Sequence, residues 1–200
     1  MTQYYHTEGF VLKQIPVGER DLLLSIFTRD FGRVSGRIKS ARSIESKMRF
    51  HASKLAWVEV TLIKTRNDTW KIVGLNSKSN LASLKNDNSL FRVINNIISL
   101  LSRMVIGEEP QEEIFNDVSC VYDLLVKLAK ENDSIVDEDV LLVEIIAVAR
   151  ILNHLGYMEH NDEIDPIFDG QIDNQMILLM APRKKQVIKA INEAFNASGL

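Results

Sequence analysis

The sequence contains a single cysteine, Cys120, among its 200 residues. One cysteine excludes an intramolecular disulfide and any zinc site built from cysteines alone. Because it falls on the apolar side of a predicted helix, we expect a small buried side chain rather than a reactive thiol. Long apolar runs are also absent, since Arg103, Glu144 and Arg150 interrupt the longest stretches. None reaches the length needed to cross a bilayer.

Targeting and catalytic motifs are lacking as well. The opening residues MTQYYHTEG show no signal-peptide pattern, so a cytoplasmic protein is expected. The glycines match neither a phosphate-binding loop nor a dinucleotide fingerprint, and no nucleophile motif is present. His154, His160, Asp162 and Asp165 have no accompanying cysteine pair and no metal-ligand spacing. The sequence therefore predicts a protein that is not an enzyme and holds no metal or other cofactor.

Charge is distributed unevenly along the chain. Residues 1–80 contain fourteen basic and seven acidic residues, a net charge of +7. Residues 81–200 contain ten basic and twenty acidic residues, a net charge of −10. This asymmetry predicts two modules, of which the first suits a polyanion and the second faces proteins or water.

Five short β-prone segments fill the first part of the chain. Turn signals separate them, namely Pro16-Val17-Gly18-Glu19 and Arg29-Asp30-Phe31-Gly32. The expected strands are 4–15, 20–28, 32–39, 54–65 and 69–76. The fourth alternates most clearly and places Val58, Val60 and Leu62 on one core-facing side. Five such strands predict an antiparallel barrel of OB type, although strand count alone leaves an SH3-like barrel open.

Beyond a polar linker at 76–80, the apolar period changes from two to about 3.6 residues. Apolar stripes with helical spacing run over 90–105, 114–128 and 140–155, and a last amphipathic helix follows Pro182. Residues 159–170 read as an acidic loop. The predicted fold class is therefore α+β with two domains, an OB-fold nucleic-acid-binding domain at 1–77 and an α-helical domain at 81–200.

The third expected strand leads into a strongly basic segment, and residues 40–53 have no clean period and are predicted to form a loop. From Arg33 to Lys54 there are seven basic residues and one acid, Glu45. OB surfaces bind single strands by combining a basic groove with aromatic platforms, for which Phe50 and Trp57 are candidates, although solvated surface charge and core packing are the alternatives. The predicted DNA-binding residues are Arg33, Arg37, Lys39, Arg42, Lys47, Arg49, Lys54 and Trp57.

Several segments, in order, resemble the bacterial recombination-repair mediator family RecO. They are Thr7–Leu12, Gly18–Thr28, Phe31–Val34, Ile38–Arg42 and Ser46–Arg49, within residues 4–75. The helical remainder is similar mainly through Leu152–Tyr157. The resemblance implies an N-terminal OB domain, a helical domain and no catalytic turnover. It also implies binding of single- and double-stranded DNA, strand annealing, and recombinase loading with RecR and the single-stranded-DNA-binding protein.

Two further expectations follow from that resemblance. Many family members carry a four-cysteine zinc module after the position of Tyr157, whereas residues 159–170 contain no cysteine. We therefore expect no zinc and a shortened acidic loop in its place. The single-stranded-DNA-binding protein is engaged in the family through an acidic, hydrophobic C-terminal tail, which needs an apolar pocket beside cations. The last helix offers both, and its predicted partner-binding residues are Arg183, Lys184, Lys185, Val187, Ile188 and Ile191.

Two other function classes compete with this prediction. A protein-interaction or regulatory adaptor would have an OB-like barrel that binds no DNA and a basic segment that is only solvated surface. A hydrolase or nuclease would need a clustered carboxylate or metal site that the sequence does not provide.

Overall fold

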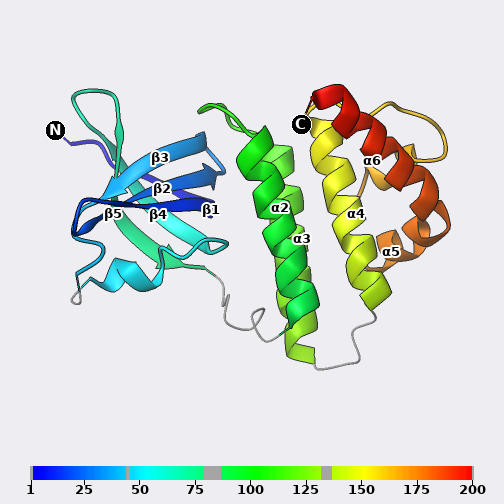
Figure 1. Ribbon diagram of the computed structural model, residues 1–200, viewed down its shortest axis with the longest axis horizontal. Coiled ribbons are helices and arrows are strands. Elements are labelled where there is room, and N and C mark those ends of the chain that lie inside the picture. Colours follow the sequence, from blue (N-terminus) through cyan, green and yellow to red (C-terminus); the bar gives the residue numbers. More distant parts are fainter. Residues whose placement is uncertain (1, 44–45, 79–86, 132–136, 200) are drawn as a thin grey trace. The chain divides into compact units, whose positions relative to one another are not determined.

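The computed structural model describes residues 2–43, 46–78, 87–131 and 137–199 (Figure 1). The chain divides into two compact units, one of residues 1–82 with 98–112 and the other of residues 83–97 with 113–200. The division expected from the sequence, 1–77 and 81–200, stays a prediction. No helix within the described ranges is both long and apolar enough to span a membrane.

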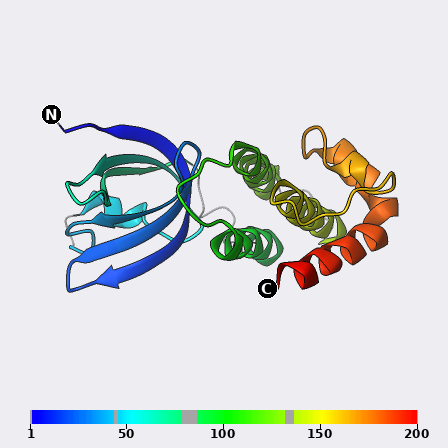
Figure 2. The ribbon, with the colours of Figure 1, turned by 90° about the horizontal axis from the view of Figure 1, so that it is seen from above.

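Five strands form the first unit and wrap around a common core (Figure 2). Their bounds are β1 Tyr5–Val17, β2 Asp21–Thr28, β3 Gly32–Ile38, β4 Trp57–Lys64 and β5 Trp70–Ser77. They close in the order β1-β2-β3-β5-β4, with β1 pairing to both β2 and β4. Every pairing is antiparallel except the short parallel contact of β3 with β5. The predicted fold class, an OB-type barrel followed by helices, is confirmed.

The barrel core contains one face of each strand. Val58, Val60 and Leu62 of β4 are buried there, as the alternation in the sequence predicted, together with Leu24 and Ile26 of β2. Burial of each such side chain contributes about 1.5–3 kcal/mol. Because successive side chains of a strand point to opposite faces, the residues between these core positions lie on the outside of the barrel.

The basic segment between β3 and β4 is more regular than the loop that the sequence predicted. It contains a 3-10 helix, η1, at Lys47–Phe50. Met48 within this helix packs against the barrel core, and Ala52 after it is buried. The predicted irregular loop is therefore wrong at η1, because a single apolar contact fixes a turn too short to leave a periodic pattern.

The remaining elements are helical. They are α2 Asn88–Met104, α3 Glu112–Glu131, α4 Asp137–His154, α5 Asn174–Met180 and α6 Lys184–Ser198, with 3-10 turns η2 Asp165–Ile167 and η3 Ala181–Arg183. Asp87 caps α2 by accepting hydrogen bonds from the N–H groups of Ser89 and Leu90, at 2.8 and 3.0 Å. In the helical unit, α4 is buried on most sides and contacts α5 and α6.

Cys120 on α3 is only half-buried, less than the sequence predicted. Partial burial, with Asp117 and Asp123 nearby, raises the pKa of its thiol. The thiol therefore stays protonated at neutral pH, which keeps it a poor nucleophile.

The acidic segment after α4 is held by one buried arginine. Arg150 of α4 is 2% exposed and donates to the carbonyl oxygens of Ile167, Asp169 and Gly170 at 2.7–2.8 Å. It also donates to Asp117 of α3 at 2.9 Å. The guanidinium supplies a planar set of donors that suits several acceptors at once. Arg150 therefore links the acidic segment to α4 and α3.

Candidate nucleic-acid interface

A row of outward side chains crosses four strands of the barrel. Arg37 of β3 is in register with Leu23 of β2 and with Lys71 of β5, and Lys71 is in register with Ile63 of β4. The neighbours of Arg37 and Lys71 along their strands, among them Ile38 and Ile72, are buried in the core. Both cations therefore lie on the outside, with Leu23 and Ile63 as their neighbours in the row.

The turn between β1 and β2 meets the exit of β3. Asp21 accepts hydrogen bonds from the Ser40 N–H at 2.8 Å and from Arg37 Nε at 2.7 Å. The Ser40 hydrogen bond, followed by the Arg37 interaction, holds the pKa of Asp21 below its usual value. The Arg42 N–H donates to the Arg20 carbonyl at 2.8 Å, and its guanidinium donates to the Gly18 carbonyl at 3.1 Å. These contacts bring together the three segments that carry Arg20, Arg37 and Arg42.

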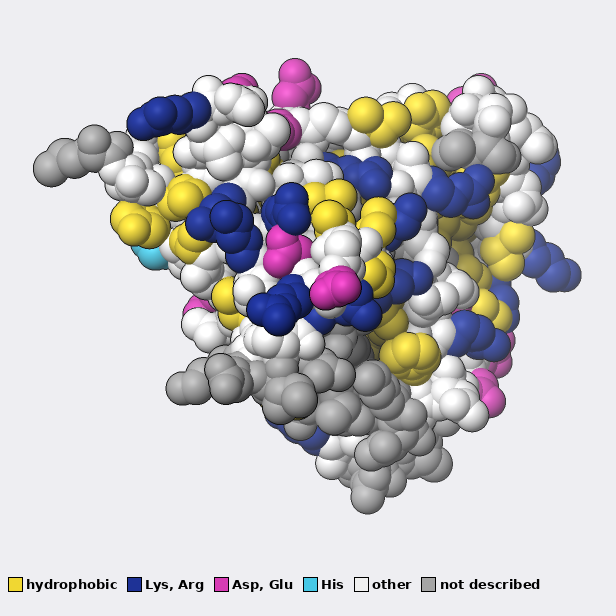
Figure 3. Space-filling view, turned by 60° about the vertical axis from the view of Figure 1, so that its left-hand side comes forward, with side chains coloured by type: hydrophobic (Ala, Val, Ile, Leu, Met, Phe, Trp, Pro, Cys, Tyr) yellow, Lys and Arg dark blue, Asp and Glu magenta, His cyan; other side chains and the backbone are white. Residues whose placement is uncertain are grey.

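We call this surface the basic face, comprising Arg20, Arg37, Lys39, Arg42 and Lys71. Its side chains are exposed, except for Lys71, which is half-buried. Glu19 and Asp21 are the acids in the adjoining turn. The space-filling view that brings the barrel forward shows dark-blue Lys and Arg side chains with fewer magenta acidic ones between them (Figure 3).

Two of the residues predicted to bind DNA lie elsewhere in the unit. Arg33 donates to the carbonyl oxygens of Ser102 and Val105, at 2.8 and 3.1 Å, and to the Ser25 hydroxyl. Its guanidinium therefore satisfies carbonyls at the end of α2. Trp57 is 4% exposed. Its ring lies 5.3 Å from Phe10 and beneath Lys78 Nζ at 4.4 Å, which leaves its faces covered.

The other predicted DNA contacts divide into three groups. Arg37, Lys39 and Arg42 come together on the basic face. Lys54 is exposed after η1. The side chains of Lys47 and Arg49 lie outside the described residues. A DNA-binding role for each stays a prediction.

The sequence pattern did not identify Arg20 and Lys71 as residues of the basic face. Lys71 lies far from the basic segment along the chain, and only the parallel pairing of β3 with β5 brings it beside Arg37. Periodicity does not reveal which strands pair. Arg20 belongs to the first turn signal, but its proximity to Arg42 depends on the antiparallel pairing of β2 with β3.

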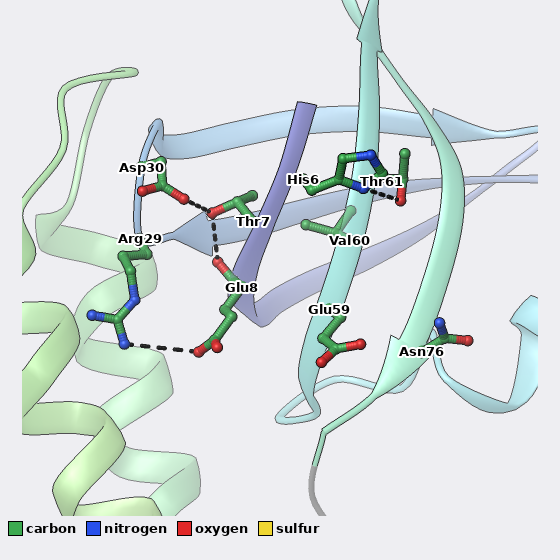
Figure 4. Close-up of a pocket in the computed structure, with 9 residues that line it drawn as sticks. All are labelled: His6, Thr7, Glu8, Arg29, Asp30, Glu59, Val60, Thr61 and Asn76. Carbon is green, nitrogen blue, oxygen red and sulfur yellow. Dashed lines mark hydrogen bonds and ion pairs between the residues drawn. The ribbon is translucent and has the colours of Figure 1, made fainter. Parts of the chain in front are cut away.

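A different flank of the barrel is acidic (Figure 4). A pocket of about 480 Å³ opens there between β1, β4 and the turn after β2. Glu8 and Glu59 are directly opposite each other on β1 and β4, and Glu8 is ion-paired with Arg29 and Lys78. Facing carboxylates repel one another and also repel phosphate. Charge thus distinguishes this flank from the basic face.

The histidines predicted to lack a metal-binding pattern each lie beside a carboxylate. His154 Nε2 is 2.9 Å from Asp117, and His160 Nδ1 is 3.0 Å from Asp165. Within the part of the chain that the structure describes, no three His, Cys, Asp or Glu residues are grouped so that they could hold a metal ion.

The predicted partner-binding residues on α6 do not share one surface. Val187 and Ile191 are buried within the helical unit, whereas Lys185 is exposed and Ile188 is 36% exposed. Arg183 donates to the Glu163 and Leu179 carbonyls, at 2.9 and 2.8 Å, and Lys184 pairs with Glu138 at 3.2 Å. Among these six residues, only Lys185 and Ile188 therefore combine an exposed cation with accessible apolar surface.

Comparison with known proteins agrees with this architecture. Residues 1–72 match the family model of the recombination protein O N terminal domain. The DNA repair protein RecO of Thermodesulfovibrio yellowstonii is 29% identical over 112 residues, covering 56% of this chain and 45% of the relative. RecO of a Cyanothece species is 28% identical over 156 residues, covering 78% of this chain and 50% of the relative. RecO of Desulfitobacterium hafniense is 24% identical over 154 residues, covering 76% of this chain and 52% of the relative.

The chain spans about half the length of the curated relatives that it matches. The family match covers β1 to β4 whole and the first three residues of β5. The match of residues 1–72 to this family model and the relatives named DNA repair protein RecO confirm the resemblance to the RecO family that the sequence predicted.

Proposed function

We propose that this chain is a DNA repair and recombination mediator that binds single- and double-stranded DNA through the basic face of its barrel. The relatives named DNA repair protein RecO support the repair role. The observation that carries the DNA-binding role is the parallel pairing that sets Lys71 beside Arg37. Lys39 and Arg42 extend this surface at the exit of β3.

Phosphate is the part of DNA that such a surface recognises. Lysine and arginine side chains that neutralise phosphates release condensed counterions, which drives binding without reading the base sequence. Both single and double strands present phosphates, so both should bind. A surface that neutralises strand charge also lowers the repulsion between two complementary strands, which favours annealing. None of these steps breaks a covalent bond, so the proposed role is not enzymatic.

Two protein partners complete the proposal. A RecR-like protein and the single-stranded-DNA-binding protein are proposed to act with the chain in loading recombinase. For the acidic tail of the latter, the accessible part of α6 offers Lys185 beside Ile188. A cation next to exposed apolar surface complements a tail of that composition.

The direct test is a fluorescence titration of the full chain with single- and double-stranded oligonucleotides of one sequence, across a series of salt concentrations. The proposal expects binding to both, with affinity falling linearly on a log–log plot against salt. A strand-annealing assay with two labelled complementary oligonucleotides should show acceleration over the spontaneous rate. Absence of binding to either form would favour the adaptor alternative.

A further inference from the structure

Phe50, at the end of η1, exposes 78% of its surface although it is a large apolar side chain. Leaving a phenylalanine in water forgoes the favourable free energy of burying it. The other aromatic residue predicted as a platform, Trp57, is buried. Phe50 therefore has accessible ring surface of the kind that a base can stack on, whereas Trp57 does not.

The position of Phe50 is fixed from both sides along the chain. Before it, Met48 packs against the barrel core. After it, the His51 N–H donates to the Met48 carbonyl at 3.1 Å, and His51 Nδ1 accepts from the Ser77 N–H of β5 at 3.1 Å. Ala52 is fully buried. An aromatic ring on a turn anchored in this way loses little conformational freedom when a partner binds.

The chemistry around Phe50 favours a nucleic acid as that partner. Along the chain it follows Arg37, Lys39 and Arg42, which are exposed on the basic face. Exposed Lys54 follows four positions later. Phosphates attracted by these charges bring bases to the ring, and every base has a flat face that can stack on it. In a duplex those faces are already stacked on their neighbours.

We infer that Phe50 is a stacking platform for an unpaired base, so that the barrel binds single-stranded DNA more tightly than a duplex. This rests on the proposed DNA-binding function and adds a ligand class to it. Duplex binding depends on the basic face alone. Single-strand binding adds one base contact, with little dependence on which base is present.

The test compares Phe50→Ala with Ile106→Ala in the full chain. Ile106 is 79% exposed in the same unit, but it precedes Glu108 and Glu109 rather than basic residues. Three probes of equal length are used, about 15 nucleotides each, near the site size of one OB fold. They are a single strand, a duplex, and a backbone in which abasic units replace every nucleoside.

Phe50→Ala should weaken binding of the single strand by about 5- to 100-fold, which is the range for losing one stacked base. Its binding of the duplex and of the abasic backbone should not change. Ile106→Ala should leave all three affinities unchanged. Phe50→Trp should retain single-strand affinity, and its fluorescence should be quenched by the single strand but not by the abasic backbone.

Equal losses on all three probes, or no loss on any, would overturn the stacking role while the wild-type titrations still support DNA binding. A wild-type chain that binds none of the probes would contradict the proposed function and the stacking role together. Thermal unfolding of Phe50→Ala should match that of the wild type, because the side chain is exposed.

Discussion

Arg37 on β3 and Lys71 on β5 are neighbours on the outside of the barrel because these two strands pair in parallel. Two cations this close repel each other, and that repulsion costs stability. Asp21 offsets part of it by pairing with Arg37 at 2.7 Å. A phosphate bound between the two cations would offset more. Several measurable consequences follow from this arrangement and from the contacts that support it.

Replacement of Asp21 by Asn should make stability less sensitive to acid. The pKa of Asp21 is lowered in the folded state, so its stabilising contribution is present above the unfolded-state value and is lost as pH falls through the folded value. The difference in unfolding free energy between wild type and Asp21→Asn should be constant above about pH 5 and shrink below about pH 4. Urea unfolding across this range measures it. Asp162→Asn, in the exposed acidic segment, serves as control, and a difference that does not vary with pH would contradict the assignment.

Gly32 and Gly18 form a matched pair for substitution by alanine. Both have φ of +58°, where an L side chain is strained by about 1–2 kcal/mol. A Cβ on Gly18 would meet nothing within 4 Å, whereas one on Gly32 would lie 2.2 Å from the Glu109 carbonyl oxygen. Gly32→Ala should therefore lose more stability than Gly18→Ala, by about a further 1–3 kcal/mol. Equal losses in chemical denaturation would show that the segment at Glu109 does not press on this turn.

Arg150→Met should destabilise the helical unit by about 3–5 kcal/mol, the cost typical of breaking a buried ion pair from one side. Methionine fills similar space but leaves three carbonyl oxygens without their donor and removes the Arg150 contact of Asp117. Arg92→Met, on the exposed side of α2, should change stability by less than about 0.5 kcal/mol. Urea denaturation of both variants tests the comparison. A loss below about 1 kcal/mol in Arg150→Met would mean that the acidic segment is not held by this side chain.

The proposed tail site on α6 predicts a charge-dependent affinity. Calorimetry with the C-terminal peptide of the single-stranded-DNA-binding protein should show binding that weakens about tenfold in Lys185→Glu, since one favourable pair becomes repulsive. Lys189→Glu provides a control, because Lys189 already pairs with Glu193 within α6. Identical titrations for wild type and Lys185→Glu, or no heat with either, would end the proposal for α6.

The sequence predicted the strands well because their alternation records which face each one buries. Val58, Val60 and Leu62 lie in the core as their spacing indicated. The site was harder to predict, because it depends on contacts between distant segments. Arg33 belongs to the basic segment, yet its guanidinium donates to Ser102 and Val105. Trp57 alternates with core residues and is itself covered by Lys78. Neither contact can be recognised from the residues that neighbour Arg33 or Trp57 in the sequence.

Phe50 illustrates a further limit of reading the sequence alone. The sequence offers both Phe50 and Trp57 as base platforms but places only Trp57 among the predicted DNA-binding residues, because composition does not distinguish an exposed ring from a buried one. Their exposed fractions, 78% and 4%, separate them. In the short helix η1, Met48 packs against the barrel core and Phe50 does not.

In the proposed function, the basic face carries the phosphate contacts. The most direct measurement is the salt dependence of single-strand binding by a variant with Arg37, Lys39, Arg42 and Lys71 all replaced by Ala. The control replaces Arg92, Lys130, Lys185 and Lys189, which changes net charge equally on exposed helix positions. Each lost phosphate contact should lower the slope of log K against log salt by about 0.7. If the basic face binds phosphate, the slope of log K against log salt should be reduced by about 2–3 in the basic-face variant and unchanged in the control. Equal slopes in the basic-face variant and the wild type would contradict it.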